Sequence, residues 1–433
     1  MKPGLLSFDE AFAALMARAH PISQTEVVAT LEASGRVVAK DQRSALDVPP
    51  MDNTSMDGYA VRCADLAREP GVRLRVAQRI AAGHIGEPLQ PGTAARIFTG
   101  AMIPEGADAV VMQEQATADG GFVTVHHLPQ PGEWIRRAGE DIRAGSVILP
   151  AGTRLSPQAT GLAASVGLAS LPVVRRVRAA CFFTGDELVM PGEPLPPGAI
   201  YNSNRFVLNA LLRGLGCEVT DLGIVPDSLE ATRAALREAA RGNDLIVTSG
   251  GVSVGEEDHV KAAVQAEGEI DLWQIAIKPG KPLAHGTVRR GEAGPGGSGA
   301  ASGEASGAGG GAGGGAASGG RAHFIGLPGN PVSSFVTFLL FVRPFVLRLQ
   351  GVQALEPKAW AMRADFDWPR PDKRREFLRA RINADGGLDL FPNQSSAVLT
   401  STVWGDGLVD NPPQHRIARG DTVRFLPFSE LLS

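Results

Sequence analysis

The sequence predicts a multidomain protein of the α/β and β classes that includes a three-layer α/β domain, and three observations lead to this prediction. The chain has 433 residues, which at roughly 150 residues per domain corresponds to about three domains. Hydrophobic residues make up 43% of the chain and charged residues 20%, so sizeable apolar cores can form. From residue 177 to 350 apolar strands alternate with helices, whereas short apolar runs broken by Pro and Gly fill residues 47–139.

Composition excludes several classes of protein. The 42 Lys and Arg residues and the 46 Asp and Glu residues give a net charge of -4, which excludes a generally basic nucleic-acid-binding surface. Cys63, Cys181 and Cys217 are too widely spaced for a disulfide framework or a zinc site, so we expect a reducing, cytoplasmic compartment. We expect neither a signal peptide nor a membrane span, because the longest apolar run, residues 335–342, is far shorter than the roughly 20 residues of a span.

Two short helices flank the β-rich region. Ser7 and Glu10 have the spacing of a capping box, and Ser156 followed by Pro157 is typical of a second helix start. Because these two segments resemble each other more than the region between them, we place them in one discontinuous domain. The expected domains are 1–46 with 140–176 as an N-terminal/linker domain, 47–139 as a β-rich domain, 177–350 as the α/β domain, and 351–433 as a C-terminal β domain, barrel-like or a sandwich.

The α/β region has a regular alternation of elements. Continuous apolar strands followed by helices predict a parallel sheet that is covered on both faces. The expected strands are 179–183, 217–222 and 244–248, and the expected helices are 204–213, 228–240, one from about 257 and a long one from 331.

Residues 290–321 differ in composition from the rest of this region. Of the 53 glycines in the chain, 15 lie between residues 291 and 320, where Ala and Ser supply most of the rest. Such a segment offers almost nothing to bury, so we interpret it as a flexible insert between two strand-like flanks, 283–288 and 323–325. Its role cannot be read from the composition.

Polar, glycine-rich loops follow the predicted strands of the α/β region. In parallel sheets, ligands bind beyond the carboxyl ends of the strands. Glycines allow close backbone approach to a ligand, and Lys278 and Lys281 add positive charge on a proline-stiffened loop. One such loop is equally well a plain turn, but several at one sheet edge predict a phosphate- or oxyanion-binding rim. The loops are 184–187, 249–255, 278–282 and 327–331.

Four carboxylates are expected at the same edge: Asp186, Glu187, Asp227 and Asp258. They would repel an anionic ligand unless a cation lay between them. Mg²⁺ resolves this conflict, because it is bound by one or two carboxylates together with substrate phosphates. Helix capping is the alternative explanation for Asp258. None of the loops is a Walker A or a G-x-G-x-x-G motif, which excludes ordinary nucleotide triphosphatases and dinucleotide-binding enzymes. The β-rich region has polar stretches of its own at 49–60, 98–101 and 139–142, which are either turns or part of a site.

Taken in order along the chain, seven motifs resemble those of the molybdopterin molybdenumtransferases, the family that includes the gephyrin E-domain. They are SMDGYA (55–60), FTGA (98–101), GEDI (139–142), TGDEL (184–188), SGGVS (249–253), KPGKP (278–282) and LPGNP (327–331). The resemblance extends from about Leu6 to Leu432, and fewer residues match the family after Gln350. It implies an elongated, four-domain homodimer that inserts molybdate into adenylated molybdopterin with Mg²⁺ and releases AMP, which gives the molybdenum cofactor.

The resemblance also implies a site between the α/β molybdopterin-binding domain of one subunit and the β-rich domain of its partner. The implied catalytic residues are Asp57, Thr99, Asp141, Asp186, Glu187, Asp227, Asp258, Lys278 and Lys281, of which Asp186, Glu187 and Asp258 would hold Mg²⁺. The implied cofactor-binding residues are Thr184, Gly185, Asn202, Ser249, Gly250, Gly251, Ser253, Pro328, Gly329, Asn330, Arg375 and Ser396. The adenylyltransferase of the preceding step is an implied partner, and which carboxylates touch the metal stays open.

Two other functions stay open at this point. A molybdopterin adenylyltransferase resembles the α/β domain alone, and a gephyrin-like scaffold would keep the fold without catalysis. The flanking β domains argue against the first, and the intact charged motifs argue against the second. The sequence does not distinguish molybdate from tungstate, identify the molybdoenzyme that receives the product, or give the affinity of the dimer.

Overall fold

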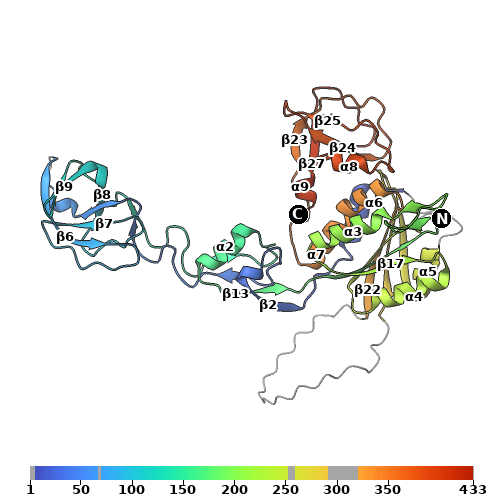
Figure 1. The fold of residues 1–433 in the computed structure, drawn as a ribbon, viewed down its shortest axis with the longest axis horizontal. Coiled ribbons are helices and arrows are strands. Elements are labelled where there is room, and N and C mark those ends of the chain that lie inside the picture. Colours follow the sequence, from blue (N-terminus) through green and yellow to red (C-terminus); the bar gives the residue numbers. More distant parts are fainter. Residues whose placement is uncertain (1–4, 67–69, 252–258, 291–319, 433) are drawn as a thin grey trace, which may run out of the picture.

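The computed structural model describes residues 5–66, 70–251, 259–290 and 320–432. Figure 1 shows an elongated molecule with a β-rich unit at one end and an α/β unit at the other. A small unit lies between them, and the C-terminal unit lies beside the α/β unit. The predicted fold class, a three-layer α/β unit with further units rich in strands, is confirmed.

The α/β unit is built on a seven-stranded sheet with the order β1-β19-β21-β22-β18-β14-β17. Strands β17, β14, β18 and β22 run parallel, as predicted. However, β21 is antiparallel to both β22 and β19, so the prediction of a wholly parallel sheet is wrong on this side. Only residues 276–281 separate β19 from β21, too few for the crossover that parallel neighbours need. The strands are β1 (Leu5–Leu6), β14 (Arg178–Thr184), β17 (Glu218–Val225), β18 (Leu245–Ser249), β19 (Gly268–Ile275), β21 (Pro282–Arg289) and β22 (Arg321–Leu327).

Helices cover both faces of this sheet (Figure 1). One apolar core, with Leu212 and Phe341, joins the sheet to α1, α3, α6 and α7, and a second, with Leu236 and Val264, joins it to α4 and α5. The expected helix start near residue 257 lies outside the described residues. The helices are α1 (Phe8–Met16), α3 (Ser203–Gly214), α4 (Leu229–Ala240), α5 (His259–Glu267), α6 (Pro331–Thr337) and α7 (Arg343–Leu349).

The helix that begins at Pro331 continues through a π-helical turn (Phe338–Val342) into α7. Pro344, which lacks an N–H donor for the preceding turn, follows directly after this π-helical turn. In the described part of the chain, this helix alone is long and apolar enough to span a membrane, and 94% of its most apolar window is buried inside the protein. Its apolar side chains belong to the core of the α/β unit.

The amino-terminal segment also belongs to this unit. Ser7 Oγ accepts from the Glu10 amide at 3.2 Å and Glu10 Oε2 accepts from the Ser7 amide at 2.8 Å, so α1 begins with the predicted capping box. Strand β1 pairs with β19, and Ala11 and Leu15 are fully buried in the α/β core. The structure therefore separates β1 and α1 from the linker domain in which residues 1–46 were placed, because the apolar face of α1 packs on the α/β unit.

The small middle unit is formed by two segments that lie far apart in the sequence. Strand β2 (Thr25–Ala29) pairs with β13 (Ser170–Val174), and β3 (Gln42–Arg43) pairs with β12 (Val147–Leu149). The unit also contains α2 (Pro157–Ser165), which Ser156 caps and which has Pro157 in its first turn, as predicted.

The β-rich unit holds a six-stranded sheet with the order β8-β5-β7-β6-β10-β9. Its strands are β5 (Gly58–Val61), β6 (Val72–Ile80), β7 (Thr93–Ile97), β8 (Ala109–Met112), β9 (Ala116–Asp119) and β10 (Phe122–Val125), with the separate pair β4 (Asn53–Thr54) and β11 (Ile135–Arg136).

The C-terminal unit holds another six-stranded sheet, which includes the short strand β20 from the α/β unit. Its elements are β20 (Ile277–Lys278), β23 (Trp360–Arg363), β24 (Arg375–Ile382), β25 (Leu388–Leu390), α8 (Thr400–Trp404), β26 (Gly407–Asn411), β27 (Thr422–Pro427) and α9 (Phe428–Leu431). Because β20 pairs with β24, this sheet is continuous between the two units.

Candidate functional site

The loops that follow β14, β18 and β22 meet at one edge of the α/β sheet, as predicted from the sequence. Ser249 Oγ donates to the Pro328 carbonyl oxygen at 2.9 Å. Asn204 Nδ2 donates to Ser249 Oγ at 2.8 Å and to the Gly329 carbonyl oxygen at 2.7 Å. Asn204 was not among the predicted site residues, and its position in the first turn of α3, two residues after the predicted Asn202, is the sequence signal that could have identified it.

The loop between β19 and β21 lies at the same edge, because β19 runs parallel to β22 once β21 has reversed between them. Glycine is needed where these loops pack closely. A Cβ on Gly250, which has φ +100°, would lie 2.7 Å from the Thr184 carbonyl oxygen, and a Cβ on Gly280 would lie 2.4 Å from Thr337 Oγ1. A side chain at either position would push the loops apart.

The predicted carboxylates differ in their positions at this edge. Asp186 and Glu187 follow β14 and are exposed, and the Glu187 carboxylate folds over Gly185, 2.6 Å from where a Cβ would stand. Asp227 is exposed after β17, whose carboxyl end lies at the same edge. Asp258 and Ser253 lie outside the described residues.

Amide side chains provide polar groups for a ligand. Asn202 is 2% exposed; its Oδ1 accepts from the Arg205 amide at 3.1 Å, while its Nδ2 has no partner among the described residues. Asn330 stands at the N-cap position of α6, ahead of Pro331, but its side chain makes no capping hydrogen bond. A buried donor is costly to leave unpaired, so the Asn202 amide is a candidate donor to a ligand at this edge.

The two predicted lysines differ in their surroundings. Lys278 Nζ lies 3.2 Å from Glu376 Oε1 and 3.6 Å from Asp372 Oδ2, so its charge is compensated by the C-terminal unit. Lys281 is exposed and forms no ion pair within the described part of the chain. Of the two, Lys281 has its positive charge available for an anion at the rim.

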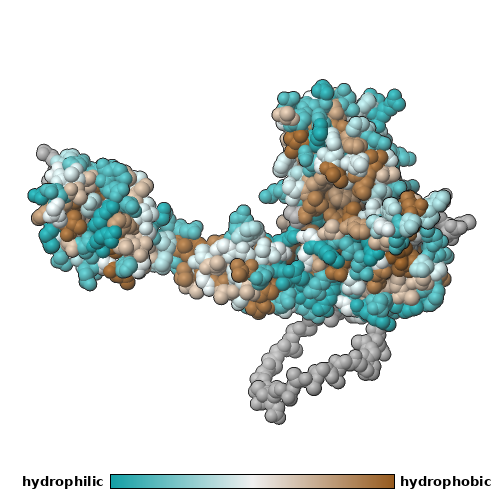
Figure 2. Space-filling view, in the orientation of Figure 1, coloured by the Kyte–Doolittle hydropathy of each residue, from teal (hydrophilic) through white to brown (hydrophobic). Residues whose placement is uncertain are grey.

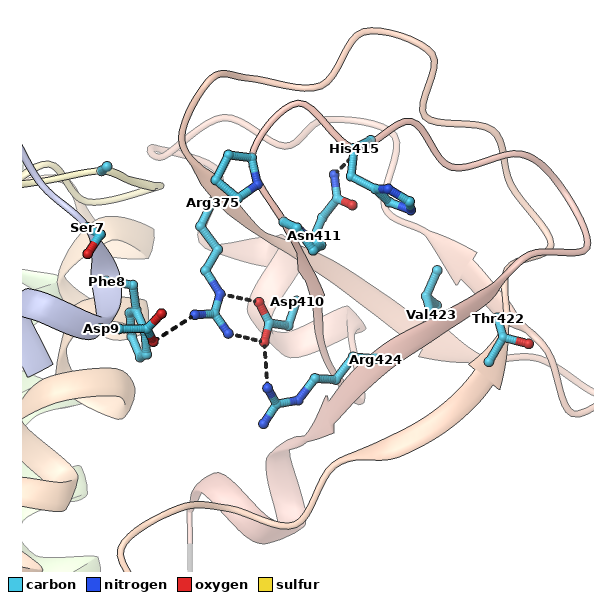
Figure 3. Close-up of a pocket in the computed structure, with 13 residues that line it drawn as sticks. Ser7, Phe8, Asp9, Arg375, Asp410, Asn411, His415, Thr422, Val423 and Arg424 are labelled. Atoms are coloured by element: carbon cyan, nitrogen blue, oxygen red, sulfur yellow. Dashed lines mark hydrogen bonds and ion pairs between the residues drawn. The ribbon is translucent and has the colours of Figure 1, made fainter.

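Arg375 and Ser396 come from the C-terminal unit. Figure 3 shows Arg375 between Asp9 and Asp410, at a cleft of about 470 Å³ between α1 and the C-terminal unit. Its Nε and Nη2 each donate to the Asp410 carboxylate at 2.7 Å, and its guanidinium stacks on Phe8 at 4.5 Å. These contacts place Arg375 in the junction between the units, whereas the Ser396 carbonyl oxygen accepts from the Val332 amide at 3.0 Å, beside the rim.

A second group of predicted residues lies in the β-rich unit. Asp57 Oδ1 accepts from the Thr99 amide and from the Thr99 hydroxyl, both at 2.7 Å. These hydrogen bonds, first the one from the amide and then the one from the hydroxyl, lower the pKa of the Asp57 carboxyl. Asp141 is exposed, and its amide donates to the Val48 carbonyl oxygen at 2.9 Å.

The two groups of residues are far apart in one chain. Figure 1 places the β-rich unit, with the Asp57–Thr99 pair, at the opposite end of the molecule from the α/β rim. Among the described residues, no group of three or more His, Cys, Asp and Glu side chains could hold a metal ion. A site that uses both groups therefore needs more than one copy of the chain.

Comparisons with known proteins match the whole length of the chain. Three family models match it in order: the MoeA N-terminal region (domain I and II) at residues 6–167, a probable molybdopterin binding domain at 180–348, and the MoeA C-terminal region (domain IV) at 361–428. A molybdopterin molybdenumtransferase of Haemophilus influenzae is 38% identical, over 99% of this chain and 100% of that protein. The chain belongs to the molybdopterin molybdenumtransferase family.

Other members agree with this assignment. Molybdopterin molybdenumtransferase 2 of Mycobacterium tuberculosis is 35% identical over 92% of this chain and 93% of that protein. A crystal structure of the molybdopterin biosynthesis MoeA protein from Pyrococcus horikoshii has a TM-score of 0.78 and 26% identity, and covers 98% of this chain and 100% of that one. Within this molybdenumtransferase-family chain, the rim falls in the segment matched by the molybdopterin-binding model, and the Asp57–Thr99 pair in the segment matched by the N-terminal model.

Proposed function

We propose that the protein inserts molybdenum from molybdate into adenylated molybdopterin, with release of AMP. The observation that supports this most strongly is the set of glycine-rich loops at one edge of the α/β sheet, inside the segment matched by the molybdopterin-binding model. The match extends over all units of the chain, so an adenylyltransferase of one α/β domain is not favoured. Nor is a scaffold, because the motif residues that carry charge are intact.

The rim binds the pterin nucleotide. Backbone amides of the glycine loops and the Asn202 amide group, which lacks a partner within the described residues, donate to its phosphates and polar ring edges. Lys281 supplies the free positive charge, and Lys278 holds the loop against the C-terminal unit through Glu376. The adenylyltransferase of the preceding step is the partner that would deliver this nucleotide.

Asp186 and Glu187 fit a magnesium ion. They are two exposed carboxylates beside phosphate-binding loops, and Mg²⁺ is commonly bound by one or two carboxylates together with substrate phosphates. Asp258 would complete this set. When bound, Mg²⁺ neutralises the charge that develops on the phosphate as AMP leaves.

The Asp57–Thr99 pair joins the site from a second copy of the chain. Thr99 occupies one carboxylate oxygen of Asp57, and the other oxygen, which has no partner among the residues that the structure describes, can accept a hydrogen bond or a proton from substrate. Because the pair and the rim lie at opposite ends of one chain, a homodimer with the β-rich unit of one subunit over the rim of the other accounts for both groups.

The test is molybdate-dependent release of AMP from adenylated molybdopterin. Asp186→Asn is expected to abolish this release while the fold is kept, because the substitution removes only one exposed carboxylate from a crowded acidic edge. Glu238→Gln, an exposed carboxylate at the far end of α4, is the matched control and should turn over normally. Unchanged turnover in Asp186→Asn would contradict the assignment of the rim.

A further inference from the structure

Two arginines in the β-rich unit stack on one phenylalanine beside the Asp57–Thr99 pair. The guanidinium carbon of Arg79 lies 4.4 Å from the centre of the Phe98 ring, and that of Arg96 lies 4.6 Å from it. Cation–π attraction holds a guanidinium in such a position. Phe98 directly precedes Thr99, so the stack is one residue away from the hydroxyl that bonds Asp57.

Arg96 uses its donors within the protein. Its Nη1 donates to the Gly58 carbonyl oxygen at 3.1 Å and its Nη2 to Gln113 Oε1 at 2.7 Å. Its guanidinium also lies 5.2 Å from the centre of the Tyr59 ring. Arg96 therefore anchors the strand that follows Asp57 and has little capacity left for a ligand.

Arg79 differs from Arg96 in its exposure and in its hydrogen bonds. It is exposed, and within the described ranges no hydrogen bond or ion pair involves its guanidinium. The stack on Phe98 orients the group without using its N–H donors. An oriented guanidinium with free donors is suited to a tetrahedral oxyanion, which it can bind through two parallel hydrogen bonds.

The strand arrangement brings Arg79 to the edge where the Asp57–Thr99 pair lies. Strands β6 and β7 are parallel, and Ile80 lies opposite Ile97, so both strands end at the same edge of the sheet. The loop after β6 contacts the loop after β7 there: a Cβ on Gly100 would lie 3.9 Å from the Ala82 Cβ. Figure 1 shows β6 and β7 side by side at the far end of the molecule.

Charge explains why a cation is needed at this edge. Molybdate and the phosphates of the pterin nucleotide are anions, and Asp57 is a half-buried carboxylate whose pKa is lowered by hydrogen bonds from Thr99, so it would repel them. Arg96 is committed to Gly58 and Gln113. Arg79 is the neighbouring guanidinium that can offset the repulsion.

We propose that Arg79 binds an oxyanion of the substrate beside the Asp57–Thr99 pair. This inference rests on the proposed function, because it takes that pair as part of the site. Molybdate and a phosphate of adenylated molybdopterin share the recognised chemistry, and separate titrations of the two substrates distinguish them.

The experiment measures KM and kcat for AMP release with each substrate varied in turn. Arg79→Gln is expected to raise KM for one substrate about tenfold, which corresponds to about 1.4 kcal/mol, and to leave kcat nearly unchanged. Arg79→Lys should recover part of the loss because it restores the charge without the planar fork. Arg75→Gln is the control, since Arg75 is an exposed arginine on the same strand, opposite Thr93 and Phe122.

Each outcome decides the inference. A higher KM for molybdate alone identifies molybdate as the bound oxyanion, and a higher KM for the pterin nucleotide alone identifies a phosphate. Unchanged KM values in Arg79→Gln, with Asp57→Asn inactive, would overturn the inference and leave the proposed site standing. Normal turnover in Asp57→Asn would show that the proposed site itself is wrong, and the role of Arg79 would fall with it.

Discussion

Hydrogen bonds from Thr99 hold the pKa of the Asp57 carboxyl below its ordinary value. The amide and hydroxyl of Thr99 both donate to one oxygen of its carboxylate at 2.7 Å, and these bonds lower its pKa. A group with a lowered pKa in the folded state contributes stability above its unfolded pKa and loses that contribution as the pH falls through the folded value. If turnover needs the ionised carboxylate of Asp57, the rate should fall as the pH drops through the folded pKa of this group.

Thr99→Val removes the hydroxyl donor but keeps the shape of the side chain. The pKa of Asp57 is then expected to rise, so the acidic limb of the activity profile should move to higher pH, while Thr99→Ser, which keeps a hydroxyl, should stay close to the parent. The pH dependence of kcat/KM for AMP release measures the shift. Coincident acidic limbs for Thr99→Val and the parent would show that this hydrogen bond does not tune the reaction.

Two neighbouring histidines, His285 buried and His323 half-buried, lie on the antiparallel side of the α/β sheet. His285 on β21 stacks against Trp273, with 5.7 Å between ring centres, and His323 on β22 packs edge-on against Phe345 at 5.0 Å. Burial is the main cause that lowers the pKa of His285 to about 3 and that of His323 to about 4. Both rings are therefore neutral in the folded protein at neutral pH.

Acid is expected to destabilise the protein through these rings. Below about pH 6.5 the unfolded chain takes up protons that the folded chain does not, so the free energy of unfolding falls by roughly 1.4 kcal/mol per pH unit for each histidine until the folded pKa is reached. His285→Phe, which keeps an aromatic ring beside Trp273, should flatten the dependence of Tm on pH between 6.5 and 4. Parallel Tm profiles for the variant and the parent would contradict this account.

Part of this architecture could be predicted from the sequence, because its signals are local. Capping residues such as Ser7 and Ser156, and glycine loops after apolar strands, fix helix starts and rim loops over a few residues. Strand direction has no such local signal. An apolar run such as β21 has the same composition in a parallel and in an antiparallel strand, so the antiparallel direction of β21 was not predicted. The Arg79–Phe98 stack was missed because it depends on cross-strand register, which a bulge between Val76 and Gln78 shifts.

The insert joins two neighbouring antiparallel strands, since Arg289 on β21 lies opposite Arg321 on β22. Shortening the segment between Arg290 and Arg321 to about four residues keeps both strands and the ion pairs of these two arginines, so it is expected to leave turnover unchanged. Loop closure costs about 0.6 kcal/mol per doubling of length, so about three fewer doublings should stabilise the protein by roughly 2 kcal/mol. Chemical denaturation and steady-state turnover of the trimmed and full-length proteins test this; a large loss of turnover with an unchanged or higher Tm would show that the insert acts in catalysis, as a lid would.

The elongated shape of the molecule has a consequence for its activity. The rim with Asp186 and the pair with Asp57 lie at opposite ends of one chain, so the proposed reaction needs two chains arranged with two-fold symmetry. The proposed dimer has two sites, and each of them would take Asp186 from one subunit and Asp57 from the other. Substitutions at these two positions should complement each other across subunits.

Mixed dimers of Asp57→Asn and Asp186→Asn chains test this arrangement most directly. Each variant alone is expected to be inactive in molybdate-dependent release of AMP. In a mixed dimer one site carries both substitutions and the other carries neither, so random mixing, with half of the dimers mixed, should restore about a quarter of the parent activity. If the co-assembled mixture stays as inactive as the separate variants although mixed dimers are present, the shared site is wrong.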